Sequence, residues 1–214
     1  LGAAVRLPDG RYEVLTGNQI GAIMIRYILE AHKQAGTLPD NAVVLKSIVS
    51  SELATTIADA YNVKMVDVLT GFKFIAEKIQ QYEDDHSQTF MFGFEESYGY
   101  LIKSFVRDKD AIQALVLLAE VAAYYKKQGK TLYDGLQDIF EEYGYYAEKT
   151  ISVTLSGSEG AEQIKTIMGN LRNEAPKAFA DVAVTMTEDF KTSKSIDANG
   201  DETAIDMPAS DVLK

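Results

Sequence analysis

The stretch Gly93–Tyr100, with the sequence GFEESYGY, has the side chains of a polyol-binding loop. It follows an apolar run with strand character and precedes a helical pattern. Glu95 can accept hydrogen bonds from sugar hydroxyls, and Ser97 can donate or accept one. Two adjacent carboxylates repel each other if both are buried, so something must offset that cost. The alternative is a solvated loop in which the glycines make the turn and both glutamates face water.

A second polar stretch, Arg107-Asp108-Lys109-Asp110, precedes a long apolar segment of helical pattern. The two aspartates suit a helix N-terminus, where each contributes about 0.3–1 kcal/mol. The helix dipole disfavours cations at the same place, so Arg107 and Lys109 are candidates for binding an anion such as phosphate. The alternative is a set of solvated charges with local ion pairs.

A third stretch, Thr70-Gly71-Phe72-Lys73, is a turn from a strand into a helix. A threonine hydroxyl and the backbone N–H groups at a helix start can bind a hydroxyl or a phosphate. The alternative is that Thr70 only caps the helix.

Metal-binding patterns are weak in this sequence. The segment Asp197–Asp201 resembles the start of a calcium loop, but Glu202 stands where Gly is needed and Pro208 where Glu is needed. His32 and His86 lack metal-ligand spacing. The chain contains no cysteine, so disulfides and thiolate metal sites are excluded. We therefore expect no metal site in this chain.

The composition narrows the class of partner. The chain has 214 residues, 46% of them hydrophobic, and a formal net charge of −11. This charge argues against nucleic acid or an anionic membrane as the main partner, because both need a basic surface. A phosphorylated small substrate needs only a few local cations.

The longest apolar run, Ala111–Tyr125, is interrupted by Gln113 and Glu120 and is too short to span a bilayer. Without a signal-peptide pattern, we expect a cytoplasmic protein.

Strand and helix patterns alternate through about residue 100, which predicts an α/β fold with a mostly parallel sheet covered by helices. In such sheets ligands bind at the carboxyl ends of the strands. The predicted strands are 42–45, 63–69 and 89–94, after two short strands within 1–15. The predicted helices start near 18, 50, 72, 108 and 132. After a boundary near 144–149 we expect a strand at 150–155, a helix at 158–172, a strand at 182–186 and a turn at 197–201.

The three polar stretches, taken in order, resemble the third-domain motifs of the α-D-phosphohexomutase superfamily. TGFK, GFEESYGY and RDKD carry this resemblance, and the opening LGAAVRLPDGRYEVLTGNQIGA resembles the segment that follows the metal loop of that family. The match covers the whole chain and is close to the phosphoglucomutase branch. One difference is Phe94, which stands where the family often has Gly.

The resemblance implies a three-layer α/β domain with a mixed, mostly parallel sheet, taken from a four-domain enzyme. It assigns residues 1–15 to the end of the second domain, 16–146 to the sugar-recognition domain, and 147–214 to an incomplete α+β fourth domain. It also implies a reaction. A phosphoserine elsewhere gives its phosphoryl group to the sugar, glucose 1,6-bisphosphate forms as the intermediate, and Mg²⁺ stabilises the transferring group.

By the same resemblance, Glu95 and Ser97 would hold the ring hydroxyls of a sugar phosphate in both of its orientations. Thr70 and Gly71 would contact the substrate in one orientation, and Lys109 would contact the sugar or its phosphate. Lys73 and Arg107 would lie nearby.

Three motifs of the family do not occur in this chain: the Ser-His-Asn-Pro phosphoserine loop, the Asp-x-Asp-x-Asp-Arg metal loop and the Arg-Pro-Ser-Gly-Thr phosphate clamp. The resemblance therefore implies no catalytic residue and no magnesium ligand here, and the chain starts at Leu1 rather than Met. We expect a piece of a longer enzyme, inactive by itself, whose partners are a sugar phosphate and the remaining domains of the same protein.

Other functions stay open on the sequence alone. A phosphomannomutase or phosphopentomutase of the same superfamily would carry similar motifs, because hydroxyl geometry sets the preference. A non-catalytic sugar-phosphate binding module and a scaffold domain with solvated loops are the remaining alternatives.

Overall fold

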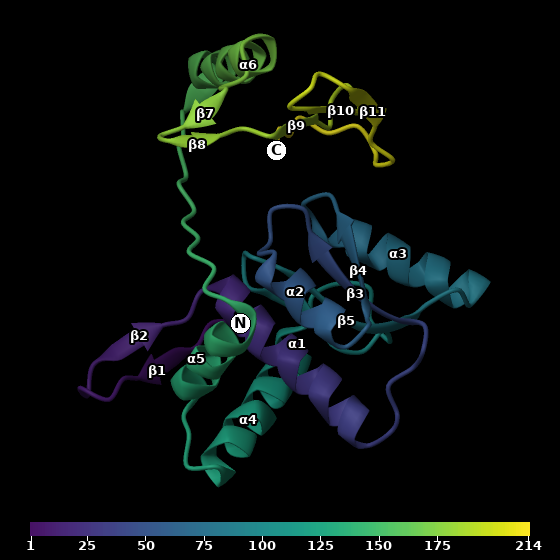
Figure 1. Ribbon diagram of the computed structural model, residues 1–214, viewed down its shortest axis with the longest axis vertical. Helices are drawn as coiled ribbons and strands as arrows, with labels where there is room; N and C mark the ends of the chain where they lie inside the picture. Colours follow the sequence, from purple (N-terminus) through teal and green to yellow (C-terminus); the bar gives the residue numbers. More distant parts are fainter. The chain divides into compact units, whose positions relative to one another are not determined.

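A computed structural model describes residues 1–214, which form two compact units, 1–148 and 149–214 (Figure 1). In unit 1, a short hairpin of β1 (Ala4–Arg6) and β2 (Tyr12–Val14) comes first, joined through a turn at Pro8-Asp9-Gly10. The helix α1 (Gly17–Gln34) follows. Thr16 caps it, because its hydroxyl accepts the Gln19 N–H at 3.2 Å while the Gln19 side chain accepts the Thr16 N–H at 2.8 Å.

One four-stranded sheet, in the order β4-β3-β5-β6, forms the centre of unit 1. Three strands are parallel, and the last is antiparallel to β5. Their bounds are β3 (Ala42–Ser47), β4 (Lys64–Val68), β5 (Thr89–Glu95) and β6 (Gly99–Leu101). The sheet is thus mixed and mostly parallel, as the sequence predicts.

Helices cover both faces of this sheet. They are α2 (Leu53–Ala60), α3 (Phe72–Asp85), α4 (Ala111–Lys127) and α5 (Leu132–Tyr143), in addition to α1. Successive side chains of a strand point to opposite faces. Accordingly, Val44 of β3 packs in one apolar cluster with α1, α2, α4 and α5, whereas Val43 and Leu45 pack in another with α3. The predicted three-layer α/β fold is confirmed.

The start of one helix and one strand differ from the expectations. The helix expected from residue 108 begins at Ala111, because Asp110 caps it by accepting the N–H of Ile112 at 2.8 Å. The strand expected at 150–155 is wrong, since this segment has no regular structure and pairs with no other strand. An alternating pattern predicts a strand only where a partner strand is available.

Unit 2 contains one helix and several short antiparallel strands. The helix α6 (Gly157–Asn173) confirms the predicted helix at 158–172. The strand expected at 182–186 is divided, because its first two residues form one complete short strand and only Met186 belongs to the next strand. The strands are β7 (Ala178–Phe179), β8 (Val182–Ala183), β9 (Met186–Asp189), β10 (Lys194–Asp197) and β11 (Glu202–Ala204). The assignment of 1–15, 16–146 and 147–214 to three domains of a longer enzyme stays a prediction.

Candidate functional site

The three parallel strands of unit 1 end side by side, so the turns that follow them form one surface. In the register of the sheet, Lys46 of β3 lies opposite Asp67 of β4 and Phe94 of β5, all within two residues of the strand ends. Such an edge is where ligands bind in parallel sheets. The predicted binding residues at this edge are Thr70, Gly71, Glu95 and Ser97.

Glu95 is buried, at 6% exposure, and a neighbouring turn fixes its carboxylate. The N–H of Gly71 donates to Glu95 Oε1 at 2.7 Å. Gly71 has a φ of +121°, which a side chain rarely allows, so this turn depends on glycine. The other oxygen, Oε2, lies 3.3 Å from the position that a Cβ on Gly99 would occupy. One carboxylate oxygen is therefore held by the backbone, and the other faces Gly99.

Lys109 reaches the same place from the segment before α4. Its Cδ lies 3.0 Å from the Cβ position of Gly99. Its Nζ lies 3.0 Å from Asp108 Oδ1, and this hydrogen bond lowers the pKa of Asp108. Lys109 and Ser97 together line a pocket of about 290 Å³. Glu95 and Ser97, from the β5–β6 hairpin, thus lie near Gly99 together with Lys109 from the segment before α4.

Thr70 does not have the capping role that the alternative interpretation gives it. The N-cap of α3 is Gly71, and no side chain makes the capping hydrogen bond. The Thr70 side chain is exposed at the same edge as Glu95. Lys73 is exposed as well, with its Nζ 4.8 Å from the ring centre of Phe74. The hydroxyl of Thr70 is therefore available to a ligand.

Arg107 lies apart from this group. It bonds to two side chains of α3, through Gln80 Oε1 at 3.2 Å and an ion pair with Glu83, and also to the carbonyl of Ser104. This is the local ion pairing that the sequence left open for the Arg107–Asp110 stretch. The structure therefore brings Lys109, but not Arg107, to the strand ends.

A buried lysine at the same edge was not anticipated. Lys46 of β3 is 0% exposed, and its Nζ lies 3.0 Å from Asp67 Oδ1 and 3.2 Å from Glu52 Oε1. A buried ammonium is costly unless it is paired, and here two carboxylates pair with it. The available signal was a lysine directly after the apolar run 42–45, which was predicted only as a strand that ends before Lys46.

Glu96 is a second residue at this edge with no role predicted from the sequence. Its carboxylate accepts the hydroxyl of Ser47 at 2.8 Å, at the end of the neighbouring strand. Glu95 and Glu96 are adjacent in sequence, but their carboxylates are bound by different turns. This separation supplies the compensation that two adjacent carboxylates need.

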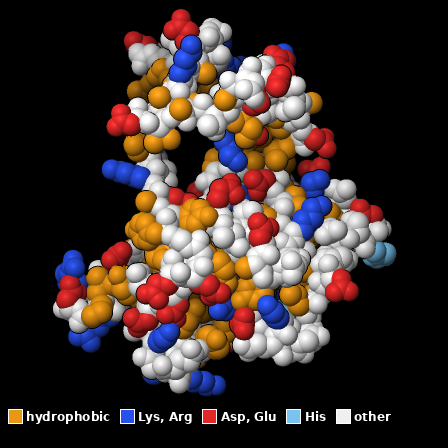
Figure 2. Space-filling view, viewed as in Figure 1, with side chains coloured by type: hydrophobic (Ala, Val, Ile, Leu, Met, Phe, Trp, Pro, Cys, Tyr) orange, Lys and Arg blue, Asp and Glu red, His pale blue; other side chains and the backbone are white.

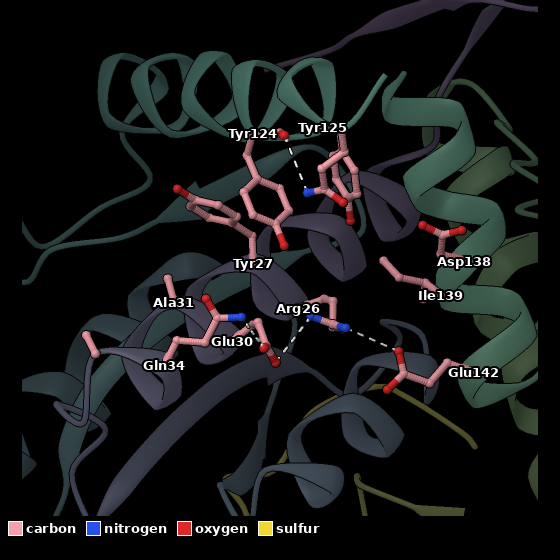
Figure 3. Close-up of a pocket in the computed structure, with 12 residues that line it drawn as sticks. Arg26, Tyr27, Glu30, Ala31, Gln34, Tyr124, Tyr125, Asp138, Ile139 and Glu142 are labelled. Atoms are coloured by element: carbon pink, nitrogen blue, oxygen red, sulfur yellow. Dashed lines mark hydrogen bonds and ion pairs between the residues drawn. The ribbon is translucent and has the colours of Figure 1, made fainter. Parts of the chain in front are cut away.

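A larger hollow of about 440 Å³ lies in the helical layer between α1, α4 and α5 (Figure 3). Its charged side chains are bound within the chain. Arg26 pairs with Glu30 at 3.4 Å and with Glu142 at 3.3 Å, and Asp138 pairs with Lys130 at 2.6 Å. A hydrogen bond from Tyr61 lowers the pKa of Glu30. None of the predicted binding residues lines this hollow, so it is separate from the site at the strand ends.

Charge on the visible surface is mixed. On the face shown in Figure 2, Lys and Arg side chains are scattered among acidic and apolar ones and form no broad basic area. No group of three or more His, Asp or Glu side chains is placed to hold a metal ion. The helices of this protein are also too short or too polar to cross a membrane.

Comparisons with known proteins point to one family. A family model described as phosphoglucomutase/phosphomannomutase, alpha/beta/alpha domain III, matches residues 16–143. The phosphoglucomutase of Staphylococcus haemolyticus is 39% identical over the whole chain, and that of Staphylococcus epidermidis is 41% identical. The chain spans only 38% of the length of either relative.

A solved structure shares the fold. The open form of the exocytosis-sensitive phosphoprotein pp63/parafusin, a phosphoglucomutase from Paramecium, matches with a TM-score of 0.53 and 14% identity. The match covers 89% of this chain and 31% of that one.

Proposed function

Because the chain belongs to the phosphoglucomutase/phosphomannomutase family, we propose that it is part of a phosphoglucomutase, which interconverts glucose 1-phosphate and glucose 6-phosphate. Its relatives with whole-chain similarity are named phosphoglucomutases, which supports glucose as the sugar. Since the chain spans 38% of their length, the activity belongs to the complete protein. The role that we propose for this chain within the complete protein is to bind the hydroxyls of the sugar.

The position of Glu95 is the observation that carries this proposal. Its carboxylate is oriented by the Gly71 N–H, which leaves Oε2 as an acceptor near Gly99. Ser97, two residues later, is exposed and offers a hydroxyl that donates or accepts. An oriented acceptor beside a hydroxyl fits two neighbouring hydroxyls of a sugar ring. Such a pair also fits both orientations of the sugar, as a reaction through a bisphosphate requires.

The other residues supply charge and further polar contacts. Lys109, beside Glu95 and Ser97, is a mobile cation suited to a phosphate or a sugar oxygen. Thr70 offers its exposed hydroxyl. The N–H of Gly71 donates to Glu95 and is not free for a ligand. We therefore propose that Gly71 contacts the substrate through its carbonyl oxygen, which can accept a second hydrogen bond besides that from the Phe74 N–H.

In the proposed reaction, a phosphoserine outside this chain exchanges its phosphoryl group with the sugar through glucose 1,6-bisphosphate. Mg²⁺, held outside this chain, supplies charge neutralisation for the transferring group. The residues of this chain bind the sugar and orient the hydroxyl that receives the phosphoryl group, which lowers the entropic part of the barrier. We therefore propose that the chain alone has no mutase activity, and turnover above background in a coupled assay of the purified chain would contradict this.

A titration with glucose 1,6-bisphosphate, followed by backbone amide shifts, tests the recognition role directly. We expect saturable shifts centred on Thr70, Glu95, Ser97 and Lys109, which disappear in Glu95→Ala. The matched control is Glu77→Ala, which removes an exposed carboxylate of α3 and should leave the shifts unchanged. If the complete protein carrying Glu95→Ala turns over at the normal rate, the assignment of the site is wrong.

The family model covers phosphomannomutases as well, so mannose is the nearest alternative substrate. A phosphopentomutase is a further alternative, because small differences in hydroxyl contacts set the preference. Measuring kcat/KM of the complete protein for glucose, mannose and pentose 1-phosphates separates these cases. Absence of turnover with all three, together with saturable binding, would favour a non-catalytic binding module.

A further inference from the structure

Glu96 lies between the two proposed sugar contacts, yet its bonds run to the end of β3. The hydroxyl of Ser47 donates to Glu96 Oε2 at 2.8 Å, and the N–H of Glu96 donates to Ser50 Oγ at 3.1 Å. The oxygen Ser50 Oγ lies 2.9 Å from Ser47 Oγ and 3.4 Å from Glu96 Oε2. These three residues form a closed ring of hydrogen bonds, which we call the Glu96 ring.

The donors and acceptors in the Glu96 ring balance. Each serine has one hydroxyl hydrogen. The bonds are satisfied when the hydrogen of Ser47 goes to the carboxylate and that of Ser50 goes to Ser47 or to the carboxylate, while Ser50 accepts the N–H of Glu96. Ser47 is 0% exposed and Ser50 is 5% exposed, so the ring forms largely away from water. Hydrogen bonds to a charged acceptor are stronger than neutral ones, and more so where water is excluded.

The helix α1 restrains the same turn from another side. A Cβ on Gly17, the first residue of α1, would lie 1.9 Å from the carbonyl oxygen of Glu96. The hydroxyl of Tyr100 donates to the carbonyl of Gly17 at 2.9 Å. The backbone of Glu96 is thus packed directly against the start of a capped helix, while its side chain is bonded to β3.

From these contacts we infer that Glu96 is a positioning residue for sugar recognition, acting through Ser47 and Ser50 rather than by touching the sugar. It holds the turn so that the carboxylate of Glu95 and the hydroxyl of Ser97 keep their relative geometry. This inference rests on the proposed function. A misplacement of about 1 Å can cost on the order of 10²-fold in rate, so we expect Glu96→Ala to lower kcat/KM roughly 10- to 100-fold.

A double-mutant cycle in the complete protein tests the inference. The variants are Glu96→Ala, Ser47→Ala and their combination, because Ser47 donates to the Glu96 carboxylate, with Glu95→Ala for the proposed contact and Glu77→Ala as a control. If Glu96 acts through the ring, the combined variant should lose about as much kcat/KM as the worse single variant. Losses that multiply would overturn the inference, because they would show that the two residues act separately.

A conservative variant separates positioning from mere stability. Glu96→Gln retains an oxygen that accepts the Ser47 hydroxyl, so its kcat/KM should stay within about threefold of wild type. If Glu96→Ala does not fold, Ser47→Ala and Ser50→Ala, which remove only one oxygen each, replace it in the cycle. Activities are compared well below each thermal midpoint, so a loss seen there reflects the folded protein.

The Glu95→Ala variant separates a failure of the positioning role from a failure of the proposed site. If Glu95→Ala loses turnover while Glu96→Ala keeps it, the positioning role is wrong and the proposed site stands. If Glu95→Ala turns over at the normal rate, the proposed site itself is wrong. The positioning role of Glu96 is then wrong as well, because it rests on that site.

Discussion

At the scale of single residues, the missing side chain of Gly99 lets Lys109 and Glu95 approach each other. A methyl group there would stand 3.0 Å from Lys109 Cδ and 3.3 Å from Glu95 Oε2. We expect Gly99→Ala to displace the flexible lysine and weaken the binding of glucose 1,6-bisphosphate by roughly tenfold. Calorimetric titration of the chain measures this change.

The matched control for that variant is Gly169→Ala in α6, where a Cβ meets nothing within 4 Å. It should leave the affinity unchanged. Equal affinities of the Gly99→Ala variant and the wild type would show that Lys109 and Glu95 do not act on the same ligand.

The buried ammonium group of Lys46 should contribute to the free energy of unfolding. Lys46→Met keeps the apolar stem but leaves Asp67 and Glu52 without their shared cation. Because both carboxylates are partly exposed, we expect a loss of about 1–3 kcal/mol in the free energy of unfolding rather than the larger cost of a fully buried charge. Urea denaturation measures it, with Lys64→Met, an exposed residue of β4, as the control. A loss no greater than that of the control would contradict the prediction.

Residue type makes Glu95, Ser97, Thr70 and Lys109 candidates, and the family resemblance is what assigns them to the substrate. Their role in binding stays a prediction. Lys46 and Glu96 became visible only in the structure, because burial and contacts between neighbouring strand ends set them apart. Spacing along the chain does not encode such contacts.

At the scale of elements, apolar periodicity predicted the helices and the parallel strands of unit 1 well. The helices have apolar faces with a period near 3.6, and buried strands are short apolar runs between turns. The strand β6 (Gly99–Leu101) was missed because three residues are too few to show a pattern. As a result, the loop from strand to helix expected after β5 is in fact the turn of a β5–β6 hairpin.

The capping hydrogen bonds at the N-terminus of α5 should stabilise the protein in a pH-dependent way. Asp134 accepts hydrogen bonds from the backbone N–H and the hydroxyl of Thr131, at 2.7 and 2.8 Å, and these bonds lower its pKa. A lowered pKa means that this contribution to stability is present above the unfolded pKa of about 3.9 and is lost as the pH falls through the folded pKa.

We therefore expect Asp134→Ala to lower the free energy of unfolding by about 1 kcal/mol at pH 7. Denaturant titrations at pH 7 and below about pH 4 should show the difference from wild type narrowing on acidification. Glu141→Ala, on the exposed side of the same helix, is the control. A difference that stays constant with pH would exclude the charged cap as its cause.

At the scale of the whole molecule, both apolar clusters are formed by residues numbered 146 or lower. Unit 1 therefore has a core of its own, and we expect a chain ending at Glu148 to fold. Its thermal midpoint should lie within about 4 °C of that of unit 1 in the full chain. Differential scanning calorimetry measures both midpoints, and loss of the cooperative transition in the shorter chain would show that unit 1 needs residues from unit 2.

The pairing of Glu95 with Gly99 across the β5–β6 hairpin limits how the protein can evolve. One inserted or deleted residue in the intervening turn would shift the register and reverse the faces of β6. Tyr100 would then lose its hydrogen bond to Gly17. Changes in length are tolerable in the irregular segment 150–155, which is mostly exposed and has no partner strand. Under the proposed sugar-binding role, a change of sugar preference should therefore arise by substitution within the turn, and length variation should accumulate outside it.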